Sequence, residues 1–188
     1  MKDIILKNIS FGFSEKTVIN NFSYTFKAGS IVHITGPSGC GKSTLARLIA
    51  GLICPCDGTI LNIPSQISMV FQDDRLCEEF NAVSNVALAL NKPKKIDIIE
   101  NFKKINIDNF ISPVGYFSGG MKRRVAIVRA VMRKSDLIIF DEAFKGLDNK
   151  LKYTVMDYVK NNLNGRTAIF ITHNEDEINY FGGDVINL

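Results

Sequence analysis

The chain has 188 residues, 46% hydrophobic and 22% charged, which is enough apolar material for one compact domain with a buried core. Its formal net charge is +4, with 23 basic residues spread among 19 acidic ones, and this pattern disfavours an extended basic arm for nucleic acid. No apolar run approaches the roughly 18 residues of a membrane span, and the first apolar stretch breaks too early for a secretory signal. We therefore expect a cytosolic chain. The four irregularly spaced cysteines fit a reducing compartment better than a disulfide framework or a metal site.

The first thirty residues alternate apolar and polar side chains over 3–13 and 17–26. This period of two predicts antiparallel strands with one solvated face. From residue 31 the pattern changes to short, continuously apolar strands that are each followed by a helix. The expected strands are 31–35, 136–140, 167–172 and 184–188, and the expected helices are 42–52, 150–163 and 175–181. Strands that alternate with helices imply right-handed crossovers and a parallel sheet.

A further strand is expected over 67–72, and no strong strand signal follows it for about sixty residues. Apolar residues recur with helical spacing over 81–90, 95–105 and 120–134. This pattern predicts a helical subdomain over about residues 73–134, inserted into a single domain of residues 1–188.

A glycine-rich loop with the spacing G-x-x-x-x-G-K-S lies between the expected strand 31–35 and the helix after it. In that context the motif predicts a phosphate-binding loop, because glycines let successive N–H groups face an anion at a helix N-terminus. Lys42 would contact the outer phosphates of ATP, and the Ser43 hydroxyl would coordinate Mg²⁺. The predicted nucleotide-binding residues of this loop are Gly36, Pro37, Ser38, Gly39, Cys40, Gly41, Lys42, Ser43 and Thr44.

Two acidic residues, Asp141 and Glu142, end the apolar strand that begins near residue 136. The carboxyl end of a buried parallel strand lies beside the phosphate loop, so we expect Asp141 to hold Mg²⁺. Glu142 is then the candidate general base that polarises the attacking water.

A second, weaker anion site is predicted where Ser118, Gly119 and Gly120 open an amphipathic helix. With the other motifs in order, "ISFGF", "GPSGCGKST", "VFQDDRL", "FSGGM", "LIIFDEAFKGLD" and "IFITHNEDE", the chain resembles the nucleotide-binding subunits of ABC (ATP-binding cassette) transporters. The resemblance extends from residue 3 to about residue 185. The fold it implies is α/β: a P-loop NTPase with a mostly parallel sheet core, an N-terminal antiparallel β subdomain and the inserted helical subdomain.

The resemblance assigns roles to four further residues. Phe13 matches the aromatic that stacks on adenine, although an ordinary strand aromatic beside Phe11 is the alternative. Gln72 would reach Mg²⁺ or the attacking water, and His173 would contact the γ-phosphate. Asp148 would meet a facing subunit, and it can also cap the helix that follows it.

In the family that the chain resembles, two cassettes pack head to tail. Ser118, Gly119 and Gly120 of one would close over the γ-phosphate held by the other, so that ATP drives closure of a homodimer and hydrolysis releases it. The segment after Gln72 would lie against integral membrane permease subunits, which places the chain at the cytoplasmic face of the membrane. An extracellular solute-binding protein is expected if the transporter is an importer, and no nucleic acid is expected.

Short strings in the chain look most like importers of the nitrate, sulfonate and taurine group, while an exporter stays open. The alternative from another class is a soluble ABC ATPase that remodels nucleic acid or ribosomes. We expect no regulatory domain after the cassette.

The usual family signature reads Leu-Ser-Gly-Gly-Gln, and Met121 replaces its glutamine here. Because methionine lacks the hydrogen-bonding amide, the resemblance implies weaker contacts to the partner's ATP. We expect Lys122, Arg123 and Arg124 to form a solvated basic helix face, and His33 to be buried and satisfied.

Overall fold

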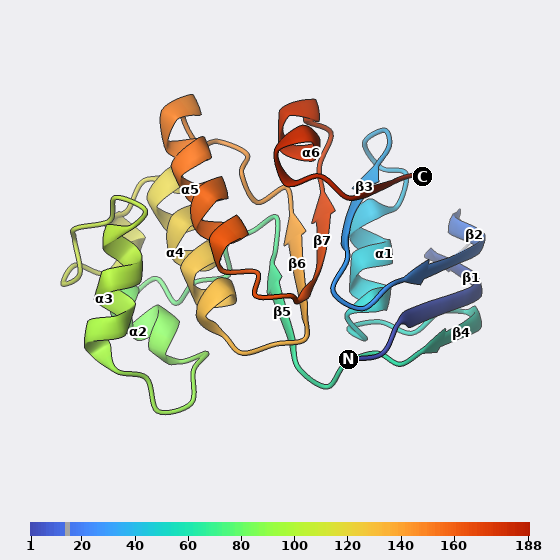
Figure 1. The fold of residues 1–188 in the computed structure, drawn as a ribbon, viewed down its shortest axis with the longest axis horizontal. Coiled ribbons are helices and arrows are strands. Elements are labelled where there is room, and N and C mark those ends of the chain that lie inside the picture. Colours follow the sequence, from blue (N-terminus) through green and yellow to red (C-terminus); the bar gives the residue numbers. More distant parts are fainter. Residues whose placement is uncertain (14–15) are drawn as a thin grey trace. The chain divides into compact units, whose positions relative to one another are not determined.

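A computed structural model describes residues 1–13 and 16–188 (Figure 1). By their internal contacts these residues form two compact units, which are described separately. Unit 1 comprises Met1–Ile67, Ser135–Asp141 and Gly165–Leu188, and unit 2 comprises Ser68–Lys134 and Glu142–Asn164.

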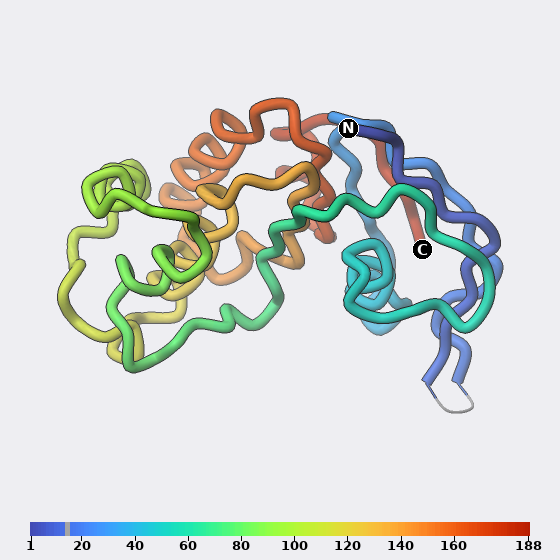
Figure 2. Tube along the Cα trace, turned by 90° about the horizontal axis from the view of Figure 1, so that it is seen from below, coloured from blue at the N-terminus to red at the C-terminus, as the bar shows by residue number. Residues whose placement is uncertain are grey.

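Unit 1 begins with a three-stranded antiparallel sheet, which confirms the prediction for the first thirty residues. Its strands are β1 (Ile4–Phe13), β2 (Lys16–Phe26) and β4 (Asp57–Leu61), in the order β2-β1-β4. Figure 2 traces these three segments side by side. The sequence did not predict β4, because four of its five residues are exposed and it has no clear alternation. Pairing with β1, as in Lys7 with Thr59, makes this segment a strand.

Unit 1 also holds a parallel sheet in which neighbouring strands follow the order β6-β7-β3-β8. The strands are β3 (Ile31–Thr35), β6 (Leu137–Asp141), β7 (Thr167–Ile171) and β8 (Asp184–Asn187). Every residue of β6 and β7 is buried, as their continuous apolar runs predict. Because the strands are parallel, their carboxyl ends lie at one edge of this sheet. Strand β5 (Ile67–Val70) crosses the boundary between the units after its first residue.

Two helices belong to unit 1, α1 (Lys42–Ile49) and α6 (Glu175–Phe181). Helix α6 has the predicted bounds. Helix α1 is shorter than predicted, because Gly51 adopts a left-handed backbone conformation with φ 67°.

Unit 2 consists mainly of helices: α2 (Ala82–Ala87), α3 (Lys95–Lys103), α4 (Gly119–Met132) and α5 (Asn149–Asn161), with a 3₁₀ turn at Val114–Tyr116. Helix α4 contacts the other three. Their shared core includes the fully buried Val86, Phe102, Val125 and Val155. Helices α2, α3 and α4 lie within the predicted insertion, whereas the alternation of strands and helices predicts that α5 belongs with the parallel sheet; it groups instead with unit 2. The single-domain interpretation stays a prediction.

In the part of the chain that the structure describes, no helix is long and apolar enough to cross a membrane.

Candidate nucleotide site

The phosphate loop connects the end of β3 to α1 in unit 1, as the motif predicts. Gly41 is the N-cap residue of α1, with φ 110°, and a Cβ there would lie 2.8 Å from Val18 Cγ1 of β2. Only glycine fits this conformation and this close approach without strain. No side chain caps α1 and no acidic residue occupies its first turn. The first N–H groups of the helix are therefore arranged for an anionic ligand.

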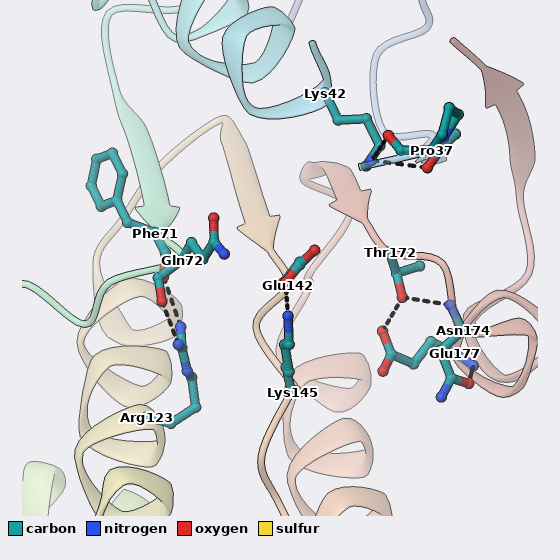
Figure 3. Close-up of polar contacts among 11 residues, drawn as sticks. Pro37, Lys42, Phe71, Gln72, Arg123, Glu142, Lys145, Thr172, Asn174 and Glu177 are labelled. Carbon is teal, nitrogen blue, oxygen red and sulfur yellow. Dashed lines mark hydrogen bonds and ion pairs between the residues drawn. The ribbon is translucent and has the colours of Figure 1, made fainter. Parts of the chain in front are cut away.

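Lys42 curls back over the loop (Figure 3). Its Nζ donates to the carbonyl oxygens of Gly36 at 2.9 Å and Pro37 at 2.8 Å, and the residue is only 9% exposed. Gly36 has φ 138°, and a Cβ there would lie 2.6 Å from the carbonyl oxygen of Leu188. Carbonyl oxygens of the loop thus hold the buried Lys42 ammonium beside the loop itself. A compact positive charge in this place is what the outer phosphates of a bound nucleotide require.

The predicted magnesium ligands of unit 1 are Ser43 and Asp141. Ser43 lies in the first turn of α1, which follows β3, and Asp141 is the buried last residue of β6. Strands β3 and β6 are both parallel neighbours of β7, so Asp141 and the loop that leads from β3 to Ser43 lie at the same edge of the sheet. Hydroxyl and carboxylate oxygens fit Mg²⁺, which keeps water and substrate phosphate among its ligands. The described residues contain no cluster of three His, Cys, Asp or Glu side chains that could hold a metal ion.

His173 is exposed two residues after the end of β7. A network fixes the turn that carries it: the Thr172 hydroxyl donates to Glu177 Oε2 at 2.6 Å and accepts from the backbone N–H of Asn174 at 3.1 Å (Figure 3). Asn174 in turn caps α6. The sequence interpretation missed this support, although Asn174 and Glu177 have the spacing of a helix-capping pair.

Gln72 belongs to unit 2 and follows β5. Its side chain is exposed, and its backbone carbonyl accepts from Arg123 Nη2 at 2.5 Å (Figure 3). The amide side chain is therefore exposed, while the backbone that carries it is anchored to α4.

Glu142, the candidate base, is the first residue of the second segment of unit 2. Its φ of 47° is uncommon for a residue other than glycine, and such strained positions occur at functional sites. Its Oε2 lies 2.8 Å from Lys145 Nζ. The sequence interpretation had not singled out Lys145.

The signature residues begin helix α4 in unit 2. The Ser118 side chain is the N-cap and accepts from the backbone N–H of Met121 at 3.3 Å. No acidic residue lies in the first turn, and Ser118 and Gly119 are exposed. A Cβ on Gly120 would lie 3.6 Å from Leu147 Cδ2, so the start of α4 contacts the loop that leads to Asp148. These features leave the helix N-terminus open to an anion.

Asp148 caps α5, accepting from the backbone N–H of Leu151 at 3.0 Å. The capping role is therefore present, and the contact with a facing subunit stays a prediction. Phe13 ends β1 and is 56% exposed, with its ring edge-to-face on Phe11 at a centroid distance of 5.0 Å. This contact agrees with the alternative of an ordinary strand aromatic beside Phe11. Stacking of Phe13 on adenine stays a prediction.

His33 is fully buried in β3, as predicted. Its Nε2 lies 2.9 Å from the carbonyl oxygen of Gly182, while Nδ1 has no hydrogen-bond partner among the residues described. The expectation of a satisfied histidine is thus met at one ring nitrogen. Burial lowers the pKa of His33, and the Gly182 carbonyl and the Glu177 carboxylate oppose that shift.

The prediction of a solvated basic face on α4 is wrong for two of its three residues. Lys122 does form a surface ion pair with Glu78 at 2.8 Å. Arg124, however, is only 8% exposed, and its guanidinium donates to three backbone carbonyls. Arg123 likewise points to carbonyls and to Asp74. Backbone carbonyls outside helices and strands need donors, and arginine supplies several from one side chain.

Together, the parallel sheet, the glycine-rich loop before α1 and the buried lysine define a P-loop NTPase fold. The family model for the ABC transporter matches residues 19–145, so the chain belongs to that family. All the predicted family motifs except "ISFGF", "IFITHNEDE" and the last residues of "LIIFDEAFKGLD" lie within this match.

Three curated relatives are similar over most of the chain. The spermidine/putrescine import ATP-binding protein PotA of Pasteurella multocida is 33% identical, covering 93% of this chain and 52% of the relative. The Fe(3+) ions import ATP-binding protein FbpC of Photobacterium profundum is also 33% identical, covering 93% and 55%. The uncharacterized ABC transporter ATP-binding protein YybJ of Bacillus subtilis is 31% identical, covering 91% and 85%. The chain thus spans about half the length of PotA and FbpC.

Solved structures show the same fold. A bacterial Atm1-family ABC exporter with ATP bound superposes with a TM-score of 0.88 at 25% identity, covering 100% of this chain and 37% of that one. The dimeric post-hydrolysis state of the ATP-binding cassette MJ0796, bound to ADP and Pi, gives 0.85 at 26% identity, covering 98% and 94%.

Proposed function

We propose that the chain is the ATP-binding and ATP-hydrolysing subunit of an ABC transporter, which energises solute transport through membrane subunits by ATP-driven dimer closure. The observation that carries the proposal is the phosphate loop, in which a buried Lys42 ammonium and an uncapped α1 N-terminus lie together. Membership of the ABC transporter family supports it.

In the proposed reaction, the phosphate loop binds the ATP phosphates and Lys42 neutralises charge on the outer ones. Ser43, Asp141 and Gln72 would hold Mg²⁺, which neutralises charge on the β- and γ-phosphates when bound. Glu142 takes a proton from water as the water oxygen bonds to the γ-phosphorus and the bond to the ADP oxygen breaks. His173 contacts the γ-phosphate from a turn that Thr172 and Glu177 keep in place.

We further propose that two copies pack head to tail, so that Ser118, Gly119 and Gly120 of each complete the other's site. Support comes from the exposed α4 N-terminus, which has no acidic residue in its first turn. The cassette MJ0796, which is 94% covered by the match, is described as dimeric. An interfacial γ-phosphate favours the closed dimer because it contacts both copies there, and hydrolysis removes that preference.

The proposed partners are two integral membrane permease subunits, contacted by the segment after Gln72 at the cytoplasmic face of the membrane. PotA and FbpC are named as import proteins, which favours import and therefore an extracellular solute-binding protein. The nitrate, sulfonate and taurine assignment stays a prediction, because these relatives are named for other solutes. The soluble alternative, remodelling of nucleic acid or ribosomes, gains no support from the names of PotA, FbpC and YybJ, which all refer to import or transport.

The test compares the parent with Glu142→Gln. Loss of the base should reduce kcat about a hundredfold to ten-thousandfold, while ATP binding persists and an ATP-bound dimer accumulates on size-exclusion chromatography. Glu142→Gln that hydrolyses ATP as fast as the parent would overturn the base assignment. Transport is tested separately, by detergent co-purification: a polytopic membrane protein supports it, and recovery of ribosomes or DNA instead supports the soluble alternative.

A further inference from the structure

The segment that carries Gln72 is attached to helix α4 through its backbone. Residues 71–75 lie outside every helix and strand, so no regular backbone pairing serves their carbonyl groups. Two arginines of α4 serve four of them. Arg123 donates to Phe71 O at 2.7 Å and Gln72 O at 2.5 Å, and Arg129 donates to Asp74 O at 2.8 Å and Arg75 O at 2.7 Å.

Arg123 uses all three nitrogens of its guanidinium on this segment. Besides the two carbonyl contacts through Nη1 and Nη2, its Nε lies 3.1 Å from Asp74 Oδ1 (Figure 3 shows the carbonyl contacts). The side chains of the ion pair are 13% and 19% exposed, so water competes little. Because the guanidinium of Arg123 is planar and all three of its nitrogens are engaged, it fixes both the distance and the orientation of the segment that it contacts. The backbone of Gln72 therefore has a defined position relative to α4.

The same helix begins with the signature. Ser118 caps α4, and Arg123 follows it by five residues, about one and a half turns along a rigid element. A shift of the α4 N-terminus moves the Arg123 guanidinium, and through it the backbone of Gln72. One side chain thus links a residue proposed to touch the partner's nucleotide to a residue proposed to act on the chain's own nucleotide.

We propose that Arg123 is a positioning residue for Gln72, which links the backbone of Gln72 to the signature end of α4. This inference rests on the proposed function. Arg123 touches neither nucleotide nor the attacking water in this role, and acts through its contacts with Phe71, Gln72 and Asp74.

The matched variants are Arg123→Lys and Arg129→Lys, because both keep the charge, lie on α4 and contact the same segment, but only Arg123 holds Gln72. Lysine has one ammonium and cannot reproduce the fork. We expect Arg123→Lys to lower kcat about tenfold to a hundredfold with KM for ATP unchanged, since a small displacement of a catalytic group has effects of that size. Arg129→Lys should stay within about threefold of the parent. Equal losses in both variants, or an unchanged kcat in Arg123→Lys, would overturn the proposal.

A double variant asks whether Arg123 acts through Gln72. If it does, Arg123→Lys should have little further effect on kcat once Gln72→Ala is present. A full additional loss in that background would mean that Arg123 acts elsewhere, and would reject the positioning role.

Amide hydrogen exchange supplies a readout that needs no activity. Arg123→Lys should speed exchange in the peptide that contains residues 71–73 and leave α5 as in the parent. If the parent proves inactive, the proposed function fails, but hydrogen exchange still tests whether Arg123 attaches this segment to α4. An unchanged exchange rate at residues 71–73 in Arg123→Lys would contradict that attachment.

Discussion

The ammonium of Lys145 lies 2.8 Å from the carboxylate of Glu142, so the proposed general base is ion-paired to a residue three positions further along its own loop. The Lys145 side chain is 64% exposed and that of Glu142 only 17%. Water therefore screens the pair from the lysine side, and its contribution to stability is about 0.2–1 kcal/mol.

We predict that Lys145→Ala leaves the fold intact and raises kcat modestly. The melting temperature should change by no more than about 4 °C, which corresponds to about 1 kcal/mol in a chain of this size. Freeing one carboxylate oxygen from an ion pair of that strength should raise kcat by up to about fivefold. Lys145→Arg keeps the charge and should match the parent. A drop of more than tenfold in Lys145→Ala would show that Lys145 itself takes part in the reaction.

Met121 occupies the position where the family signature has glutamine. We predict that Met121→Gln strengthens ATP-dependent dimerisation about two- to tenfold, the effect of one added hydrogen bond. Sedimentation equilibrium with ATP in a Glu142→Gln background measures this directly. Met121→Leu has a similar volume without a hydrogen-bonding group, so it should match the parent. Equal affinities for Met121→Gln and Met121→Leu would mean that the amide makes no contact across the dimer.

Arg124 is predicted to be a major stabilising residue of unit 2. Its Nη1 donates to Ile105 O at 2.7 Å and Asn106 O at 2.6 Å, and its Nε donates to Gly120 O at 3.2 Å. Arg124→Met leaves these carbonyls without their donor, at a cost of about 3 kcal/mol or a fall of about 6–12 °C in melting temperature.

Lys122→Met is the matched control, because Lys122 is the neighbouring cation on α4 and pairs with an exposed Glu78. Calorimetry should show a change of no more than about 4 °C for this variant. Similar losses for Lys122→Met and Arg124→Met would contradict the role assigned to the buried guanidinium.

The elements of unit 1 that position nucleotide residues were largely predictable. The apolar runs of β6 and β7 are long enough to indicate buried strands, and the glycine spacing before Lys42 indicates its loop. Helix α6 also has the predicted bounds, although the Asn174 cap was not part of that prediction. These signals are local in sequence, so they can be recognised without knowledge of the tertiary structure.

The sequence could not predict contacts between a side chain and backbone groups that are distant along the chain. Arg123 and Arg124 stand in a run of basic residues, and nothing in that run distinguishes a solvated cation from one that binds carbonyls. Strand β4 exists through pairing with β1, and Lys145 meets Glu142 only because the chain turns sharply at a positive φ. Such features depend on which unpaired backbone groups and strand edges lie near a given residue in the folded chain.

His33 gives a prediction for pH. Burial lowers its pKa from the ordinary value near 6.5, with the Gly182 carbonyl and the Glu177 carboxylate acting in the opposite direction. The ring also stacks on Phe170 at a centroid distance of 5.3 Å, within the sheet. A histidine whose pKa is lower in the folded state binds protons more readily when unfolded. Its contribution to stability is complete above about pH 6.5, and is lost as the pH falls towards the folded pKa.

We therefore compare the melting temperature of the parent and of His33→Gln between about pH 5 and pH 7.5. Glutamine does not titrate, so the difference between the two curves should shrink as the pH falls below about 6.5, even though the variant is less stable at neutral pH. If the His33→Gln and parent curves are parallel over the whole range, burial does not control the titration of His33.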